Sequence, residues 1–83
     1  MKVTNINNKP NQFIIDHAGM LYFQSYQIII AIKNKFDNQI TLDPDWNYSR
    51  TTGKYRNIFL NETIKETREK IKAGIHKIEN LND

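Results

Sequence analysis

Tyr26-Gln-Ile-Ile-Ile-Ala-Ile-Lys33 contains the longest apolar run of the chain and is rich in isoleucine. β-Branched side chains favour extended backbone, so this stretch predicts a strand. The polar segment Asn34-Lys-Phe-Asp-Asn38 follows it, and Gln39-Ile-Thr-Leu42 is apolar at alternate positions. Two strand-like stretches around a short polar loop indicate a β-hairpin, which forms the centre of the expected sheet.

Strand-like segments also precede this hairpin. Gln12-Phe-Ile-Ile-Asp-His17 predicts a strand, and Ala18-Gly19 predicts a tight connection to the apolar stretch Met20–Gln24. Residues 3–6 predict a short edge strand. The first half of the chain is therefore expected to form an antiparallel meander of three to four strands.

A helix is expected soon after the sheet ends. Pro44 cannot donate to a strand ladder, so Asp43-Pro-Asp45 closes the strand region. Ser49 or Thr51 can cap a helix over residues 52–60 through its hydroxyl group. The side chains that we expect to pack this region onto the sheet are those of Trp46, Tyr55, Ile58 and Phe59.

A second helix is expected to begin at Thr63. Thr63 and Glu66 have the spacing of a capping box, in which each side chain satisfies the backbone of the other residue. Gly74 favours a helix end, with residues 75–81 as an extended tail that adds to the sheet. The apolar stripe that continues to Leu81 leaves a longer helix open as the alternative.

Length and composition indicate one small domain. The 83 residues predict a single α+β domain over residues 1–83, with the meander followed by two short helices packed on one face of the sheet. A core of this size is small, which leaves a homodimer open as a way to enlarge it. The absence of cysteine and of any membrane-length apolar run predicts a cytoplasmic protein without a membrane partner.

Catalytic, cofactor and metal motifs are incomplete in this sequence. Thr51-Thr-Gly-Lys54 lacks the earlier glycine and the following hydroxyl residue of a phosphate-binding loop. Asp43, Asp45 and Asn47 begin like a calcium loop, but Lys54 stands where its final glutamate is needed. His17 and His76 have no second ligand at metal-site spacing. We therefore expect neither an enzyme nor a cofactor or metal site.

The charge of the chain is concentrated after residue 49. Residues 50–83 contain eight cations and five acids, which accounts for the whole net charge of +3. On a helical wheel Arg50, Lys54 and Asn57 fall within about 60° of one another, whereas Arg56 points roughly 160° away from Lys54. Together with the loop residue before the helix, the expected contact surface is Tyr48, Arg50, Lys54 and Asn57.

Three cations of the second helix form a second candidate strip. Lys65, Arg68 and Lys72 follow one another at helical spacing and can contact an anionic partner or simply form a solvated face. Glu66 and Glu69 lie on the same helix, and their charge disfavours a role as a DNA-recognition helix.

The order of motifs resembles a known group of small proteins. It comprises Tyr22-Phe-Gln-Ser-Tyr26, the isoleucine-rich strand, Trp46-Asn-Tyr-Ser-Arg-Thr-Thr-Gly-Lys-Tyr-Arg-Asn-x-Phe-Leu60, and a Glu62–Ile71 segment. It is similar to small uncharacterised proteins carried by phages and prophages of low-GC Gram-positive bacteria, over about residues 20–82. The resemblance brings no catalytic residues with it and implies a phage accessory protein.

This setting leads to a leading hypothesis and two alternatives. The first is a non-catalytic protein that binds and inhibits a host defence protein, for instance an anti-CRISPR-type inhibitor of a Cas nuclease or its RNA complex. The second is a small nucleic-acid-binding accessory protein that uses the basic and aromatic junction between loop and helix. The third is a structural protein of the phage particle that works through oligomerisation.

Overall fold

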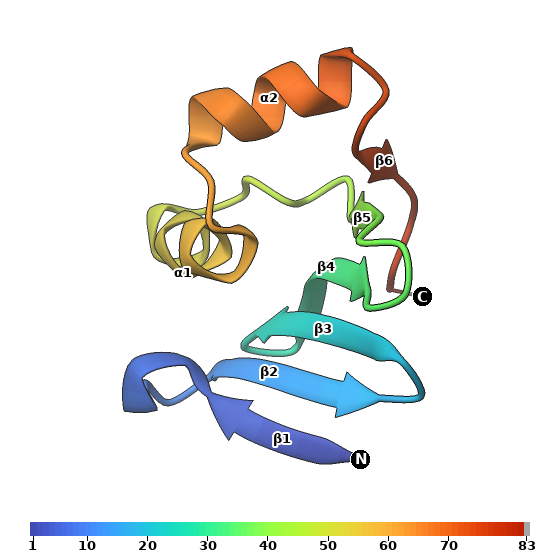
Figure 1. Cartoon of the computed structure of the whole chain (residues 1–83). Coiled ribbons are helices and arrows are strands. Elements are labelled where there is room, and N and C mark those ends of the chain that lie inside the picture. The colour runs from blue at the N-terminus through green and yellow to red at the C-terminus, as the bar shows by residue number, and fades with distance from the viewer. Residues whose placement is uncertain (83) are drawn as a thin grey trace.

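A six-stranded sheet, whose strands follow one another in chain order, is the framework of the protein (Figure 1). It is seen in a computed structural model that describes residues 1–82. The strands are β1 (Lys2–Asn5), β2 (Gln12–His17), β3 (Met20–Ser25), β4 (Ile28–Asn34), β5 (Ile40–Leu42) and β6 (Lys77–Ile78). Every neighbouring pair is antiparallel except β5 and β6, which run parallel. The expected α+β fold, with its meander and short C-terminal strand, is confirmed.

The connection between β2 and β3 depends on positive φ angles. Ala18 has φ 53° and Gly19 has φ 80°, the left-handed combination that suits the twist of a two-residue hairpin. The ring of Phe36, from the loop between β4 and β5, lies over Gly19 so closely that a Cβ there would clash with it. Gly19 is thus required by the backbone conformation and by the neighbouring loop.

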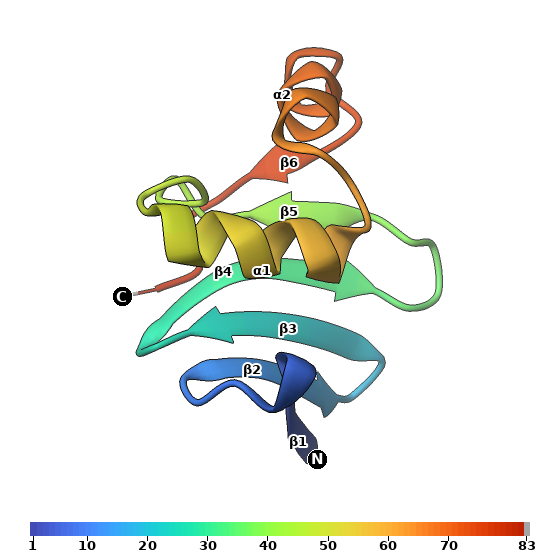
Figure 2. The ribbon, with the colours of Figure 1, turned by 90° about the vertical axis from the view of Figure 1, so that its left-hand side faces the viewer.

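The core lies between the sheet and helix α1 (Arg50–Leu60), which crosses one face of the sheet (Figure 2). Phe59 of α1 stacks on Phe23 of β3 with 5.7 Å between the ring centroids. Trp46 packs against the same cluster from the loop before α1. The fully buried apolar residues are Ile6 in the short 3-10 helix η1 (Ile6–Asn8), Phe23, Ile30, Ala31, Ile40, Leu42 and Tyr55.

The prediction that Ile58 belongs to this core is wrong, because 45% of its surface is exposed. Thr52, Tyr55 and Phe59 define the face of α1 that meets the sheet. At 100° per residue, Ile58 lies roughly 90° from the middle of that face. The remaining position on the buried side is occupied by Arg56, a charged residue.

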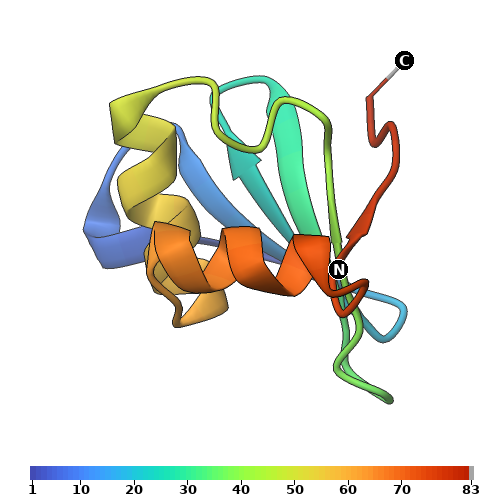
Figure 3. The ribbon, with the colours of Figure 1, turned by 90° about the horizontal axis from the view of Figure 1, so that it is seen from above.

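Helix α2 (Ile64–Lys72) begins and ends where the sequence indicates. Thr63 and Glu66 form the expected capping box, with both hydrogen bonds present. Gly74 has φ 77° and turns the chain out of the helix, which favours glycine. Seen from above, α2 runs from the end of α1 toward β6 (Figure 3). The extended tail and the added strand are therefore confirmed.

Residues 79–82 form a C-terminal strap across the end of the sheet. The Asn82 side chain accepts from the Ile29 backbone N–H at 2.8 Å and donates to the Ile29 carbonyl at 2.8 Å. The buried Asp43 carboxylate accepts from the Leu81 backbone N–H at 2.9 Å and from Asn82 at 3.1 Å. The strap thus joins β4 to the loop after β5.

Candidate functional site

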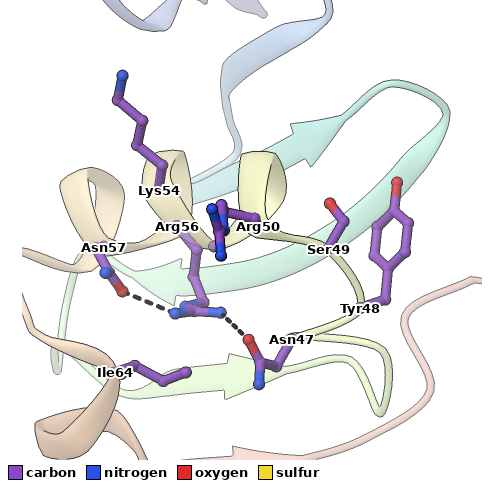
Figure 4. A pocket seen from close by; sticks show the side chains of 9 residues that line it. Asn47, Tyr48, Ser49, Arg50, Lys54, Arg56, Asn57 and Ile64 are labelled. Carbon is purple, nitrogen blue, oxygen red and sulfur yellow. Dashed lines mark hydrogen bonds between the residues drawn. The ribbon is translucent and has the colours of Figure 1, made fainter.

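The central residue of the candidate site is Arg56, whose side chain is held inside the protein with only 1% of the residue exposed. Its guanidinium lies over the Trp46 ring, 4.9 Å from the centroid. It donates to the Trp46 carbonyl at 2.9 Å. It also donates to Asn57 Oδ1 at 2.8 Å and to Asn47 Oδ1 at 3.3 Å (Figure 4). Stacking and hydrogen bonding together fix the plane of the guanidinium.

All three acceptors of Arg56 are neutral oxygens. Within residues 1–82, no carboxylate lies within ion-pair distance of the guanidinium, and the buried Nε has no partner. Burial lowers the pKa of Arg56, and the positive charge of Arg68 lowers it further, although Glu62 opposes this shift. An arginine remains protonated under such conditions, so a buried positive charge is left without a paired anion.

Arg56 lines an open hollow of about 590 Å³ at the N-terminal end of α1, called here the α1 hollow. Its walls combine the loop before α1, one side of α1 and the first residue of α2. The residues that line it are Asn47, Tyr48, Ser49, Arg50, Gly53, Lys54, Arg56, Asn57 and Ile64. This set contains three cations and no acid, and it includes the four residues of the expected contact surface: Tyr48, Arg50, Lys54 and Asn57.

Arg56 and Lys54 point in different directions, as the helical wheel predicts, but both residues line the same hollow (Figure 4). A helical wheel gives the direction of Cβ only, whereas the long Arg56 side chain extends back along the helix over Gly53. A Cβ added at Gly53 would lie 3.5 Å from Nη1 and 3.6 Å from Nη2 of Arg56.

Replacing Gly53 by alanine is expected to raise the free energy of unfolding by about 0.5–1 kcal/mol. Alanine is favoured over glycine inside a helix by this amount. The new Cβ would contact the Arg56 guanidinium at 3.5 Å, which is an ordinary van der Waals distance. Urea denaturation of the two proteins measures the difference, and a destabilised variant would contradict the spacing between Gly53 and Arg56.

The N-terminal end of α1 adds to the positive potential of the hollow. Ser49 caps the helix by accepting from the Thr52 backbone N–H at 3.1 Å. The first turn carries Arg50 and has no acidic residue, although a helix N-terminus normally attracts negative side chains. The helix end and the three cations therefore favour the same kind of ligand, an anion.

The strip expected on α2 is only partly associated with this hollow. Lys65, Arg68 and Lys72 are all exposed, and none of them lines the hollow. Arg68 follows Ile64 by one turn and is near enough for its charge to affect the pKa of Arg56. Lys65 and Lys72 are not among the charges that shift the pKa of Arg56. The seven predicted residues therefore form two groups. Four of them line the hollow, and the three cations of α2 lie beside it on the exposed side of that helix.

A second buried polar cluster lies where α1, α2 and the tail meet. The Glu62 side chain is only 7% exposed and accepts from Lys70 Nζ at 2.6 Å and from Thr67 Oγ1 at 2.8 Å. His76 Nε2 lies 3.0 Å from each Glu62 oxygen, while the buried His76 Nδ1 has no partner among residues 1–82. His76 thus contacts a carboxylate that lies fourteen residues earlier in the chain, a contact that sequence spacing does not indicate.

This cluster stabilises the charged form of Glu62. Burial raises the pKa of Glu62, but hydrogen bonds from Lys70, His76 and Thr67 outweigh it, so the pKa lies below its ordinary value of 4.5. The part of the chain that the structure describes holds no group of three or more side chains able to bind a metal ion. Among those same residues, no helix has the length and apolar composition that crossing a membrane requires.

Comparison with known proteins gives one match. No curated protein and no solved structure matches the chain. The model of a protein family matches residues 1–74, which include the α1 hollow and both helices. Because this match covers most of the sequence, the chain belongs to that family, which is described as a family of unknown function, DUF8033.

Proposed function

We propose that the protein is a non-catalytic binding protein that holds single-stranded nucleic acid at the α1 hollow. The observation that supports this proposal is the meeting of Arg50, Lys54 and the buried Arg56 around one open hollow that no acid lines. Such a site attracts a phosphate group by charge and binds it by N–H donation.

The aromatic side of the hollow favours nucleic acid over a protein partner. The Tyr48 residue is 48% exposed beside the cations, so a base can stack on its ring while a phosphate meets the cations. An acidic patch of a host defence protein, including a Cas nuclease, would meet the same cations and can also pack on this ring, but it does not present a base next to a phosphate as a strand does. Inhibition of such a protein stays the second proposal.

The shape of the site favours a single strand over a duplex. The three cations surround one hollow, whereas a duplex presents its phosphates along two extended backbones. The exposed Lys65 and Lys72 share α2 with exposed Glu66 and Glu69, so that helix does not extend the site into a continuous basic track. A short stretch of one strand, with one base stacked on Tyr48 and its phosphates on the cations, is the unit that this geometry accommodates.

Fluorescence anisotropy with a labelled strand of about twelve nucleotides tests the proposal. With three phosphate-contacting cations, the logarithm of the binding constant should fall against the logarithm of the salt concentration with a slope of about −2. Combining Arg50→Gln with Lys54→Gln should reduce that slope to about −0.7. Lys2→Gln removes one exposed cation of β1 and is the matched control that should leave binding unchanged.

The outcomes separate the partner classes. Failure to bind DNA or RNA strands at low salt would overturn the proposal. Equal binding of duplex and single strand would contradict the role of Tyr48. Retention of a purified Cas nuclease with little salt dependence, together with no strand binding, would favour the host-protein alternative.

A further inference from the structure

We infer that the α1 hollow recognises a terminal phosphate monoester, so that the end of a phosphorylated strand is its preferred ligand. This inference rests on the proposed function and specifies the chemical group that is bound. It follows from the donors that remain free around the hollow, from their total charge and from the buried position of Arg56.

The first observation is the set of unused donors on Arg56. A guanidinium has five N–H groups, and the hydrogen bonds to Trp46, Asn47 and Asn57 use three of them. One of the two that remain is the N–H of Nε, which is buried and has no partner within residues 1–82. A buried cation held only by neutral oxygens has no paired charge among these residues, and a negative ligand in the adjoining hollow would balance it.

The second observation is the orientation of the two asparagine side chains. Arginine can only donate, so Asn47 and Asn57 must each turn the amide oxygen toward Arg56. Their NH₂ groups have no acceptor within residues 1–82 and therefore stay available as donors. With Arg50 and Lys54 added, the groups that remain free around the hollow are mostly donors. A ligand that only accepts hydrogen bonds fits this lining.

The third observation is the amount of charge. An internal phosphodiester carries one negative charge, whereas a phosphate monoester carries about −1.5 to −2 at neutral pH and offers three acceptor oxygens. Arg50, the buried Arg56 and the N-terminal end of α1 favour the more highly charged group. The hollow of about 590 Å³ also leaves space for the sugar and base next to Tyr48.

The experiment compares otherwise identical single strands that end in a 5′-phosphate, a 3′-phosphate or hydroxyl groups. We expect a phosphorylated end to bind at least about tenfold more tightly than hydroxyl ends, and the two phosphate positions show which end is held. The advantage should increase severalfold between about pH 5.5 and 7.5, because the second pKa of a phosphate monoester is near 6.

Gly53→Ala is the decisive variant because its added methyl group occupies space in the hollow beside the Arg56 guanidinium without removing a charge. It should remove the preference for a phosphorylated end while its melting temperature stays at or above that of the wild type. Arg56→Lys keeps the charge but loses the planar fork, and it should reduce the preference by about tenfold. Lys2→Gln should leave the preference intact.

Two further results distinguish this inference from the proposed function. Strand binding that depends on salt but is indifferent to terminal phosphate would overturn the inference and leave the proposed function standing. Inorganic phosphate that binds the wild type but not Gly53→Ala, without any strand binding, would support the phosphate site and overturn the proposed function.

Discussion

Arg56→Ala is expected to lower the free energy of unfolding by about 3 kcal/mol. The change removes the stack on Trp46, leaves a cavity between α1 and the loop, and deprives three oxygens of their donor. Denaturation in urea, followed by the fluorescence of the single tryptophan, measures the loss. A difference below about 1 kcal/mol would contradict the burial of this side chain.

Arg56→Met separates packing from charge at the same position. Methionine fills much of the space beside Trp46 but removes a buried cation without a paired anion, so we expect it to recover most of the stability lost in Arg56→Ala. If phosphate occupies the α1 hollow, it stabilises only a protein that can bind it, by about 2.7 kcal/mol at a hundred times its dissociation constant. Added phosphate should therefore raise the melting temperature of the wild type and not that of Arg56→Met.

Glu62→Gln is the second large prediction, with an expected loss of about 2–3 kcal/mol at neutral pH. The substitution keeps the shape of the side chain but removes the charge that Lys70 and His76 meet inside the protein. Lys70 is partly exposed, which keeps the loss below that of a fully buried ion pair. Glu69→Gln, an exposed change on α2, is the control and should differ from the wild type by less than about 0.5 kcal/mol.

The same glutamate predicts a loss of stability in acid. The folded protein holds the pKa of Glu62 below its ordinary value of 4.5, so the unfolded chain binds the proton first as the pH falls. The stabilisation is complete above pH 4.5 and is lost as the pH falls through the lowered pKa. Glu62→Gln should flatten the curve of stability against pH in this range, and an unchanged curve would exclude Glu62 as a source of the acid sensitivity.

In the Glu62→Gln variant, Asp43 still makes the stability of the protein depend on pH in acid. Burial raises the pKa of Asp43, but the backbone N–H groups of Leu81 and Asp45 and the Asn82 side chain lower it by more. The sign is therefore the same as for Glu62, with stability lost as the pH falls below the ordinary value of 3.8. A double variant with Asp43→Asn should be flatter than Glu62→Gln alone.

Local sequence signals were sufficient for the elements of this fold. The isoleucine run of β4, the capping box at Thr63 and the glycine after α2 each act over a few residues. The residues that produce each of these features lie next to one another in the sequence, and the structure confirms all three features. Ile58 shows the limit of the method, because three apolar residues on a short helix do not determine where the middle of its buried face lies.

The site was predictable only where spacing along the sequence determines which residues lie together. Tyr48, Arg50, Lys54 and Asn57 meet as expected because they lie within about three turns of one another. The wheel placed Arg56 roughly 160° from Lys54 but could not show that it is buried, because the Trp46 ring and carbonyl that hold it lie ten residues earlier. The contact of His76 with Glu62 requires the whole of α2 to be in place, so no local pattern reveals it.

The C-terminal strap has a consequence for how the protein is made. Most strand pairs join neighbours in the sequence, so the meander can assemble while the chain is still being synthesised. Asp43 and the backbone of Ile29 receive their partners only when Leu81 and Asn82 have left the ribosome. A chain interrupted after Gly74 would keep the meander but expose β5 as an open edge that can pair with another molecule. Premature termination is therefore expected to give aggregates rather than a loosened monomer.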